Sequence, residues 1–424
     1  MAKRYLPQLL LSFLLLASAR ISNLAFAQVY RDYGKNRFTF AQTFIGGDLA
    51  FTPSHGQSFR FRNGDLEKVD FGNMVSPFIS VSGLHFWGRA EFFTCFSLRS
   101  ISLDNDKSFF FLRSPGTGFK YFVIPVRHNV VSPYIGMSIG SFTYRIDNAA
   151  KFTRLEFPLL AGVAYSFKYG FIELGSTYYI KNDYRYFISE SITVPLRTPR
   201  LGFILSYKYF VDLSLSNFKK NKSPNATGFD GDEGKTGRSN SIFFAIGPAY
   251  SFFTSHSSYN KATRPYLDDY RIVGLFPDLG IGYYHYKMDA AVNLSFRWYT
   301  ASLEGFGVRQ KLKRRSIALE TYKFLGDYHG FAPFLGPVLS YEEITLHEKE
   351  QGNTVFNHSN TLWQPGIIAG WDIRPKRSDW WGVRTNIRYF PFLKLKSPSP
   401  YSFSLQQIEV NFLQWVVYPG RLVF

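Results

Sequence analysis

Apolar and polar residues alternate along most of this chain. From Val292 to Trp298 every second residue is apolar, and the residues between them are Asn, Ser and Arg. The stretches 154–167 and 381–390 follow the same pattern. A repeat of two places alternate side chains on opposite faces of a β-strand, and runs of this length exceed the five or six residues of an ordinary strand. The pattern therefore predicts an all-β chain of long, half-buried strands.

Sixteen such strands are predicted, eight in each half of the chain. The first eight lie near 38–51, 77–87, 90–101, 118–126, 133–146, 154–167, 171–181 and 200–213. The second eight lie near 241–254, 277–287, 290–302, 313–325, 331–346, 362–374, 380–391 and 403–417. Short turns are expected at 87–89, 127–132, 168–170, 288–289, 326–330 and 375–379, and longer polar loops at 52–76, 102–117, 182–199, 255–276, 347–361 and 392–402. This alternation of turns and loops is typical of up-and-down transmembrane barrels.

The two halves share an order of aromatic, small and proline residues. The sequence LLAG at 159–162 matches IIAG at 367–370, and six single residues have an identical counterpart 200 positions later: Phe44, Gly47, Pro77, His85, Pro133 and Gly136. A shared order of this kind predicts an internal duplication.

Four segments are expected along the chain. Residues 1–27 have a basic start at Lys3 and Arg4, an apolar middle and a small-residue site at Ala25-Phe26-Ala27, which together predict a secretory signal peptide cleaved after Ala27. Residues 28–213 form the first repeat and residues 241–424 the second. Residues 214–240 between them are rich in Gly, Asn, Ser and charge, and are expected to be a flexible linker.

The composition bears on compartment and partners. The single cysteine, Cys95, excludes an intramolecular disulfide framework in an exported chain. Past residue 20 we find no run of apolar residues long enough for a membrane-spanning helix. A formal net charge of +18 would suggest nucleic acid in a cytosolic protein. In an exported protein it points instead to lipid phosphates or an extracellular polyanion, and nucleic acid is not expected as a partner.

Periodicity alone does not say whether the apolar faces point into a soluble core or out into lipid. Phe, Tyr and Trp make up 19% of the chain and often lie near predicted strand ends, which suits a membrane–water interface. The opposite faces carry charges in mid-strand. Inside a membrane barrel these charges would pair across the lumen, and the predicted lumen charges are Glu91, Arg99, Arg154, Glu156, Glu173, Lys208, Arg297, Asp372, Arg374, Arg384 and Arg388. We therefore favour a closed ring in lipid.

Each half resembles the small eight-stranded outer-membrane barrels of the OmpA, OmpX and OmpW type. The resemblance rests on Pro133-Tyr134-Ile135-Gly136, then "AGVAY" at 161–165, then "FIELGSTYY" at 171–179. The second half repeats this order with "PFLG" at 333–336, "AGW" at 369–371 and "WWGVRTNIRYF" at 380–390. The resemblance implies an outer-membrane barrel of a Gram-negative bacterium, with lipids of that membrane as partners, and says little about activity.

The C-terminus adds a further expectation about biogenesis. Phe424 is preceded in step by Leu422, Tyr418 and Val416, which resembles the terminal signal read by the outer-membrane insertion machinery. That machinery is therefore an expected partner during biogenesis.

Two architectures remain open at this stage. Sixteen strands could form one wide ring with a water-filled channel or two narrow rings filled by side chains. The long linker favours two tandem eight-stranded barrels, and so does the alternating sign of the first repeat's inward charges. A basic second lumen, with Arg297, Arg374, Arg384 and Arg388, keeps an anion-favouring diffusion channel as the alternative.

Candidate chemistry is sparse. We find no Gly-x-Ser-x-Gly elbow and no His-Glu-x-x-His motif, and His85 and His285 are expected to lie on the lipid-facing side near short turns. No catalytic residue, cofactor or metal is predicted. The segment "VRQKLKRRS" at 308–316 is the densest basic run, with Arg309, Lys311, Lys313, Arg314 and Arg315. It is either a solvated rim or a site for lipopolysaccharide phosphates or another polyanion. The predicted function is structural or surface-binding, with a diffusion channel as the alternative and a membrane enzyme as a third hypothesis.

Overall fold

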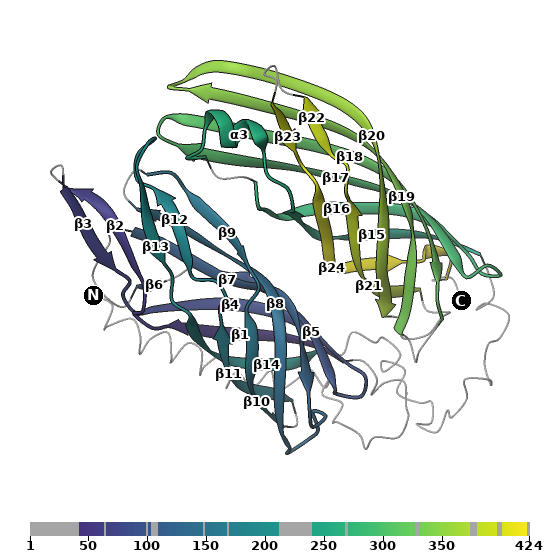
Figure 1. The fold of residues 1–424 in the computed structure, drawn as a ribbon. Coiled ribbons are helices and arrows are strands. Elements are labelled where there is room, and N and C mark those ends of the chain that lie inside the picture. The colour runs from purple at the N-terminus through teal and green to yellow at the C-terminus, as the bar shows by residue number, and fades with distance from the viewer. Residues whose placement is uncertain are drawn as a thin grey trace. The chain divides into compact units, whose positions relative to one another are not determined.

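The computed structural model describes residues 42–62, 65–98, 101–102, 109–146, 149–167, 169–211, 240–267, 270–326, 331–373, 380–396 and 401–421. The predicted signal peptide and, apart from Asn240, the predicted linker lie outside these ranges. The chain forms two compact units that divide between Leu215 and Ser216. Each is described by itself (Figure 1).

The first unit is a closed ring of eight antiparallel strands. The ring runs in the order β1-β4-β5-β7-β8-β10-β11-β14, and β1 closes it by pairing with both β4 and β14. Its strands are β1 (Gln42–Thr52), β4 (Met74–His85), β5 (Ala90–Ser97), β7 (Phe109–Phe122), β8 (Val131–Ile146), β10 (Leu159–Phe167), β11 (Gly170–Tyr178) and β14 (Leu201–Val211). All eight strands predicted for this half are present.

Two loops predicted for the first half contain a sheet of their own. The strands β2 (Gln57–Arg62), β3 (Asp65–Asp70), β12 (Asp183–Phe187) and β13 (Thr193–Arg197) pair in the order β12-β13-β2-β3. This sheet lies at one end of the first barrel in Figure 1. Val69, Phe71, Tyr186 and Leu196 from the sheet segments pack with barrel residues such as Phe142 in one buried apolar cluster. The loops at 52–76 and 182–199 are therefore ordered, with their apolar residues buried.

One strand predicted for the first half is interrupted. The segment 154–167 divides into β9 (Phe152–Glu156) and β10, with Phe157 and Pro158 between them. Both parts pair with β8 in the same register, since Glu156 lies opposite Gly140 and Leu159 opposite Met137. Proline has no N–H to donate to a sheet, which explains the gap without a change of register. A short strand, β6 (Ile101–Ser102), pairs with β4.

The second unit is also a closed antiparallel ring of eight strands. Its order is β15-β16-β17-β18-β19-β20-β21-β24, and β24 pairs back to β15. Its strands are β15 (Ser241–Phe253), β16 (Ile272–His285), β17 (Ala290–Gly305), β18 (Val308–Phe324), β19 (Phe331–Glu350), β20 (Asn353–Ile373), β21 (Trp381–Phe390) and β24 (Gln407–Val417). Because each half closes on itself, the prediction of two tandem eight-stranded barrels is confirmed and the single sixteen-stranded ring is excluded.

Five strands of the second barrel, β16 to β20, are longer than predicted. The hairpins β17–β18 and β19–β20 project past the neighbouring strands at the loop end (Figure 1). The loop predicted at 347–361 is wrong, because these residues continue β19 and β20 through a tight turn at Gln351 and Gly352, whose φ values are +48° and +90°. The helix α3 (Ser258–Thr263) and the hairpin of β22 (Lys394–Lys396) and β23 (Ser402–Ser404) pack inside this projection.

In both barrels the apolar face of the sheet points outward and the charged face points into the lumen, as a lipid environment requires. Outward side chains are large and apolar yet exposed, for example Ile135 at 61% and Leu174 at 61% in the first barrel and Trp363 at 64% in the second. Inward charged side chains such as Glu91 and Arg388 are completely buried. A soluble barrel would reverse this arrangement, whereas a transmembrane barrel turns its apolar face outward and has no unpaired edge in lipid. In the part of the chain that the structure describes, no helix has the length and apolar character needed to cross a bilayer.

The two barrels share equivalent close contacts, as an internal duplication predicts. Leu160 lies opposite Gly136 in the first barrel, and Ile368 lies opposite Gly336 in the second. In both barrels an aromatic ring packs over a glycine on the adjacent strand. A Cβ on Gly162 would lie 2.7 Å from Cζ of Tyr134, and a Cβ on Gly370 would lie 2.7 Å from Cζ of Phe334. These pairs are the fifth- and sixth-strand motifs on which the sequence resemblance rests.

The offset of 200 residues does not hold in the first strand of each barrel. Phe44 is fully buried, whereas Phe244 is 50% exposed and its neighbour Phe243 is the buried residue. The register agrees, since Gly47 lies opposite Ile79 but Gly247 lies opposite Asp278. A slip of one residue turns every side chain of a strand to the other face. The proposed equivalence of Phe44 and Phe244 is therefore wrong by one position.

The C-terminal pattern also differs from expectation. Val416 and Tyr418 are buried inside the second barrel, and the outward side chain in β24 is Trp415, which is 51% exposed. The strand ends at Val417 and is followed by the short 3-10 helix η2 (Pro419–Arg421). Val416 and Tyr418 therefore face the lumen in a strand that ends before the terminal residues, and residues 422–424 of the predicted terminal signal lie outside the described residues.

Candidate functional site

The first lumen contains a ring of two lysines and two glutamates. Lys120 Nζ lies 2.6 Å from Glu173 and 3.4 Å from Glu91. Lys208 Nζ lies 3.2 Å from Glu173 and also contacts Glu91. Glu91, Lys120, Glu173 and Lys208 lie on β5, β7, β11 and β14, and the alternation of side chains along each strand turns all four inward at one level. Each charge thus meets two of opposite sign, which offsets the cost of burying it.

A second buried ion pair, Arg113–Glu156, lies in the first lumen towards the loop end. The guanidinium of Arg113 donates two hydrogen bonds to Glu156, at 2.9 and 2.8 Å, and one to the carbonyl of Pro199 at 2.8 Å. It also lies 3.6 Å from the ring centroid of Tyr179. This planar fork geometry uses the donors that arginine has and lysine lacks. Arg113 therefore joins β7 to the residues that lead into β14.

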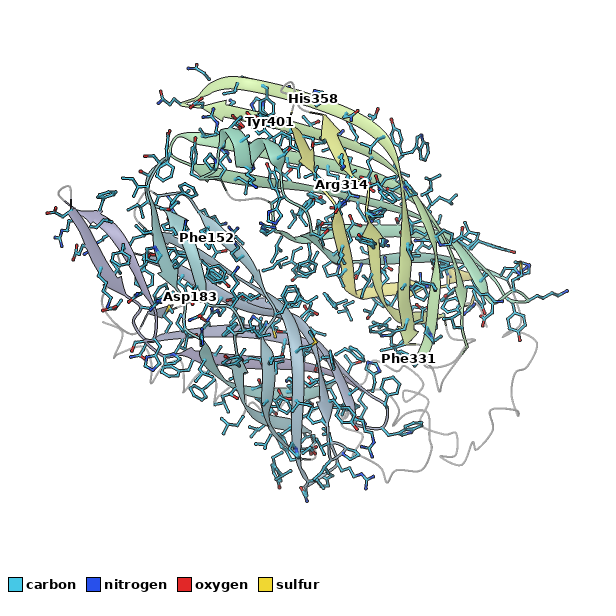
Figure 2. The ribbon with its side chains drawn as sticks, in the orientation of Figure 1. Phe152, Asp183, Arg314, Phe331, His358 and Tyr401 are labelled. Atoms are coloured by element: carbon cyan, nitrogen blue, oxygen red, sulfur yellow. The ribbon has the colours of Figure 1, made fainter. Side chains whose placement is uncertain are left out.

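The second lumen is organised around Arg314. Its guanidinium donates two hydrogen bonds of 2.6 Å to Glu342 and a further one to Glu409. Glu409 also accepts a hydrogen bond from Arg297. All four side chains are buried. Figure 2 labels Arg314 among the strands of the second barrel. The strands β17, β18, β19 and β24 each contribute one member, so this network crosses the barrel rather than following one strand.

Two further arginines complete the charges of the second lumen. Arg388 donates to Glu320 at 2.6 Å and to Asp278 at 2.8 Å. Arg384 forms a two-point contact with Asp372 at 2.7 and 2.9 Å. Neutral side chains extend the network, and Asn293 and Ser295 donate to the same Glu320 carboxylate. The middle of this barrel is therefore a cross-linked polar layer.

The expectation of a basic second lumen is wrong for the described residues. Four buried arginines pair with five buried carboxylates, which are Asp278, Glu320, Glu342, Asp372 and Glu409, and a sixth carboxylate, Glu348, is also buried. The prediction rested on Arg297, Arg374, Arg384 and Arg388. Of the carboxylates in this half of the chain, it assigned only Asp372 to the lumen. Strand phase would have found the others, because each alternates with outward apolar residues. A lumen with this balance gives no preference for anions.

Apolar layers lie on both sides of the ionic layer in each barrel. In the second barrel one cluster includes Phe243, Tyr322 and Phe334 near the short turns. Another lies at the loop end, where Phe403 and Leu346 pack with α3 and the β22–β23 hairpin. The first barrel has the corresponding clusters around Phe171 and Phe142. Side chains thus fill each lumen in an apolar, ionic and apolar order.

The helix α3 is attached to the wall of the second barrel. Its first turn is capped by Ser257, whose side chain accepts from the Asn260 N–H at 3.1 Å. At its other end Arg264 donates to Glu350 at 3.1 and 2.7 Å and to Glu348 at 3.2 Å. Burial and the Glu348 carboxylate raise the pKa of Tyr259, whose protonated phenol donates to Glu348 at 3.3 Å. The helix is therefore a fixed cover over the loop end.

The structure gives the predicted lumen charges different surroundings. Glu91, Glu173 and Lys208 meet in the first ring, and Arg297 and Arg388 lie in the second network. Glu156 and Asp372 belong to separate pairs with Arg113 and Arg384. Arg154 is only half-buried, and its guanidinium stacks 4.3 Å from the ring centroid of Phe152. Arg99 and Arg374 lie outside the described residues. Arg113 was missed because β7 begins nine residues before the predicted strand at 118–126. Lys120 lies inside that predicted strand, and its inward phase was overlooked.

The basic run at 308–316 is part of β18 and is divided between its two faces. Arg309 and Arg315 have side chains 60% and 78% exposed, and Lys313 is also exposed. Lys311 is half-buried on the same outward face, whereas Arg314 points into the lumen and is only 2% exposed. The assignment of Arg314 to an external patch is therefore wrong. We call the outward set Arg309, Lys311, Lys313 and Arg315 the basic stripe.

The basic stripe begins where the apolar wall ends. The pairing register places Phe296, Ile317, Tyr341 and Trp363 in one outward row across β17, β18, β19 and β20. The next outward row towards the loop end contains Trp298, Arg315, Glu343 and Thr361. Beyond it the outward residues on these strands are polar or charged, except Val355 on β20, which is 46% exposed. The outward face thus changes over these rows from an aromatic row to a largely polar surface that contains the basic stripe.

Possible catalytic groups are also placed by the structure. His85 ends β4 and packs against Phe92, with ring centroids 5.4 Å apart. His285 ends β16, and its Nδ1 accepts from the Met288 N–H at 3.2 Å. Both histidines lie beside short turns, as predicted, but His85 is only 2% exposed and so is not open to lipid as expected. Among the described residues no group of three or more His, Cys, Asp or Glu side chains is arranged to hold a metal ion.

No protein-family model and no curated protein matches this chain. Among solved structures, Neisserial surface protein A aligns over 42% of this chain and 96% of its own, with 13% identity and a TM-score of 0.28. The attachment invasion locus protein Ail of Yersinia pestis aligns over the same shares, with 12% identity and a TM-score of 0.26. An outer membrane channel from Pseudomonas putida F1 aligns over 92% of this chain and 97% of its own, with 10% identity and a TM-score of 0.23. At such scores the assignment of the fold rests on the strand pairing itself.

Proposed function

We propose that this chain is a non-enzymatic outer-membrane protein of a Gram-negative bacterium, with a structural or surface-binding role. Two closed barrels would hold ordered structure at the cell surface, and the loop ends would face outward. The filling of both lumens by paired charges between apolar layers is the observation that carries this proposal. An eight-stranded ring has just enough room for such side chains.

Single-channel recording tests the absence of a pore. The full-length protein, refolded and inserted into a planar bilayer, is expected to give no stable conductance steps in the nanosiemens range. A porin-sized barrel in the same bilayer serves as the positive control. Regular steps from this protein would support the diffusion channel and overturn the proposal.

Surface labelling tests location and orientation. An epitope inserted at Gly307, in the turn between β17 and β18, is expected to be accessible to antibody on intact cells. The matched control is the same epitope between Met288 and Asp289, in a short turn at the other end of the barrel. It should react only after the outer membrane is permeabilised. The reverse pattern, or labelling of neither site in the outer-membrane fraction, would contradict the proposed placement.

An assay for hydrolysis addresses the enzymatic alternative. Outer-membrane glycolipids, phospholipids and a mixed peptide library should remain intact when incubated with the folded protein. Turnover that is lost on substitution of His85 or His285 by Ala would show a catalytic function and overturn the non-enzymatic part of the proposal.

A further inference from the structure

The basic stripe lies at a defined depth on the outer wall of the second barrel. Outward rows along a strand are about 7 Å apart, and a tilt near 40° reduces this to about 5 Å along the membrane normal. Arg315, Lys313 and Lys311 therefore lie about 5, 10 and 15 Å beyond the row of Tyr341 and Trp363. The interfacial layer extends about 5–8 Å beyond the hydrocarbon core, so Arg315 lies within it, and Lys313 and Lys311 lie at and beyond its outer edge, at the depth of a bulky headgroup.

The charge of this face is unbalanced. Across the outward rows of β17 to β20 beyond the aromatic row, the described cations are Arg309, Lys311, Lys313, Arg315 and Lys349, and the described anions are Glu304 and Glu343. Arg309 pairs with Glu304 at 2.9 Å and Arg315 with Glu343 at 3.6 Å. Lys311 and Lys313 lie between these two pairs and have no carboxylate partner among the described residues. The centre of the stripe therefore presents two unneutralised ammonium groups.

Hydroxyl donors surround the two lysines. Lys313 lies opposite Thr300 on β17 and Thr345 on β19, and Lys311 lies opposite Ser302 and His347. Thr345 and Ser359 are themselves 2.6 Å apart. Ammonium and hydroxyl groups are the donors that bind phosphate oxygens, with lysine acting as a point charge. The surface is chemically complementary to a phosphorylated headgroup.

We propose that the basic stripe binds the phosphates of an anionic glycolipid in the outer leaflet, with Lys311 and Lys313 as its principal contacts. The acyl chains of that lipid would lie along the apolar wall below, beside Ile317, Leu319 and Leu339, which are 45%, 48% and 44% exposed. Continuity between this wall and the stripe favours a lipid over a soluble polyanion. The inference rests on the proposed membrane placement of the barrel.

Binding of lipid A to the full-length protein tests this inference. The protein is refolded in neutral detergent and titrated with bisphosphorylated lipid A or with its dephosphorylated form. The wild-type protein is expected to bind the phosphorylated lipid at least tenfold more tightly. In the variant with Lys311→Gln and Lys313→Gln, affinity should fall about 25-fold, since a cation near an anionic membrane surface contributes about fivefold.

Lys394→Gln provides the matched control. Lys394 is an exposed lysine on β22, away from the outward faces of β17 to β20, and its loss should change affinity by less than twofold. Folding of each variant is checked by the shift in gel mobility on heating. If the double variant fails to fold, the comparison of the two lipids on wild-type protein still decides the question.

Three results would overturn the inference. Wild-type protein could bind the two lipids equally, or the folded double variant could retain wild-type affinity. A soluble sulfated oligosaccharide could also compete as tightly as lipid A and lose binding in the same variant, which would assign the stripe to a polyanion from solution. Any of these would leave the conductance and surface-labelling results unchanged, so failure here is distinguishable from failure of the proposed function.

Discussion

The two barrels share a ring and differ in what fills it. Both have eight antiparallel strands, and both pack an aromatic ring over a glycine between the fifth and sixth strands of the ring. The first ring balances two lysines against two glutamates in one compact cluster. The second distributes four arginines over five carboxylates along a longer stretch of lumen. The same backbone architecture therefore accepts two different ionic cores.

The difference follows from the geometry of the cations. A lysine ammonium is a point charge that can contact two carboxylates at once, so four groups form a closed cluster. An arginine presents a planar fork and binds one carboxylate at two points while donating to another. Arg314 does this with Glu342 and Glu409 and so connects strands on different sides of the barrel. The arginine core is the more extensively cross-linked of the two.

The barrels also differ at their loop ends. The first is covered by a separate four-stranded sheet, and the second extends its own wall and packs α3 inside it. Only the second, among the described residues, carries a run of outward cations directly beyond the aromatic row. A surface role that depends on this stripe therefore belongs to the second barrel.

The largest effect is expected from removing the centre of the arginine core. Arg314→Met leaves Glu342 and Glu409 buried with fewer cations, and should lower the free energy of unfolding of the second barrel by about 3–5 kcal/mol. Urea titration in lipid vesicles measures this by tryptophan fluorescence, because all tryptophans except Trp87 lie in the second half. Adding Glu342→Gln should restore part of the loss. An unchanged midpoint would show that the network does not stabilise the barrel.

A smaller effect is expected in the lysine core. Lys120→Met removes one cation, but Lys208 still contacts both Glu91 and Glu173, so the cost should be about 2 kcal/mol. Circular dichroism during urea unfolding follows both barrels, so the part of its transition that tryptophan fluorescence does not follow reports the first barrel and should shift. The tryptophan midpoint, which is dominated by the second barrel, should not move. A shift of both midpoints together would contradict the independence of the two units.

Equal effects are expected at the shared glycines. A Cβ at Gly162 would lie 2.5 Å from the Leu174 carbonyl oxygen, and one at Gly370 would lie 2.2 Å from that of Thr385. Gly162→Ala and Gly370→Ala should each cost about 1–3 kcal/mol, since the backbone must shift. Gly420→Ala is the control, because no atom lies within 4 Å of its added Cβ. A cost in only one barrel would show that the two pairs are not equivalent.

The smallest effect concerns the cover of the second barrel. Arg264 is partly exposed, so Arg264→Ala should cost no more than about 1 kcal/mol globally. It should nevertheless increase amide hydrogen exchange in α3, because the contacts with Glu348 and Glu350 are lost. Lys261→Ala, on the same helix, should leave exchange unchanged. Unaltered exchange in the Arg264 variant would show that apolar packing alone holds the helix.

The sequence predicted a large part of the fold because a period of two is a local property. All sixteen barrel strands were located, and the sense of their faces follows from where the aromatic and charged residues lie. Arg314 could also have been placed correctly, since it alternates with the outward cations of β18. The error came from reading the basic run as one patch. The short strands within loops 52–76 and 182–199 were not predicted, because the apolar residues of these loops pack against strands that are distant in the sequence.

What the sequence by itself determined is therefore the class of fold, the strands and, along each strand, which residues share a face. Only the tertiary structure decided that each half closes on itself and which charges meet, because register depends on pairing between distant strands. Phe44 and Phe244 show this most clearly: identical residues at matching positions point to opposite faces after a slip of one. Arg388 likewise reaches Asp278 only because ring closure brings residues 110 positions apart to one level of the lumen.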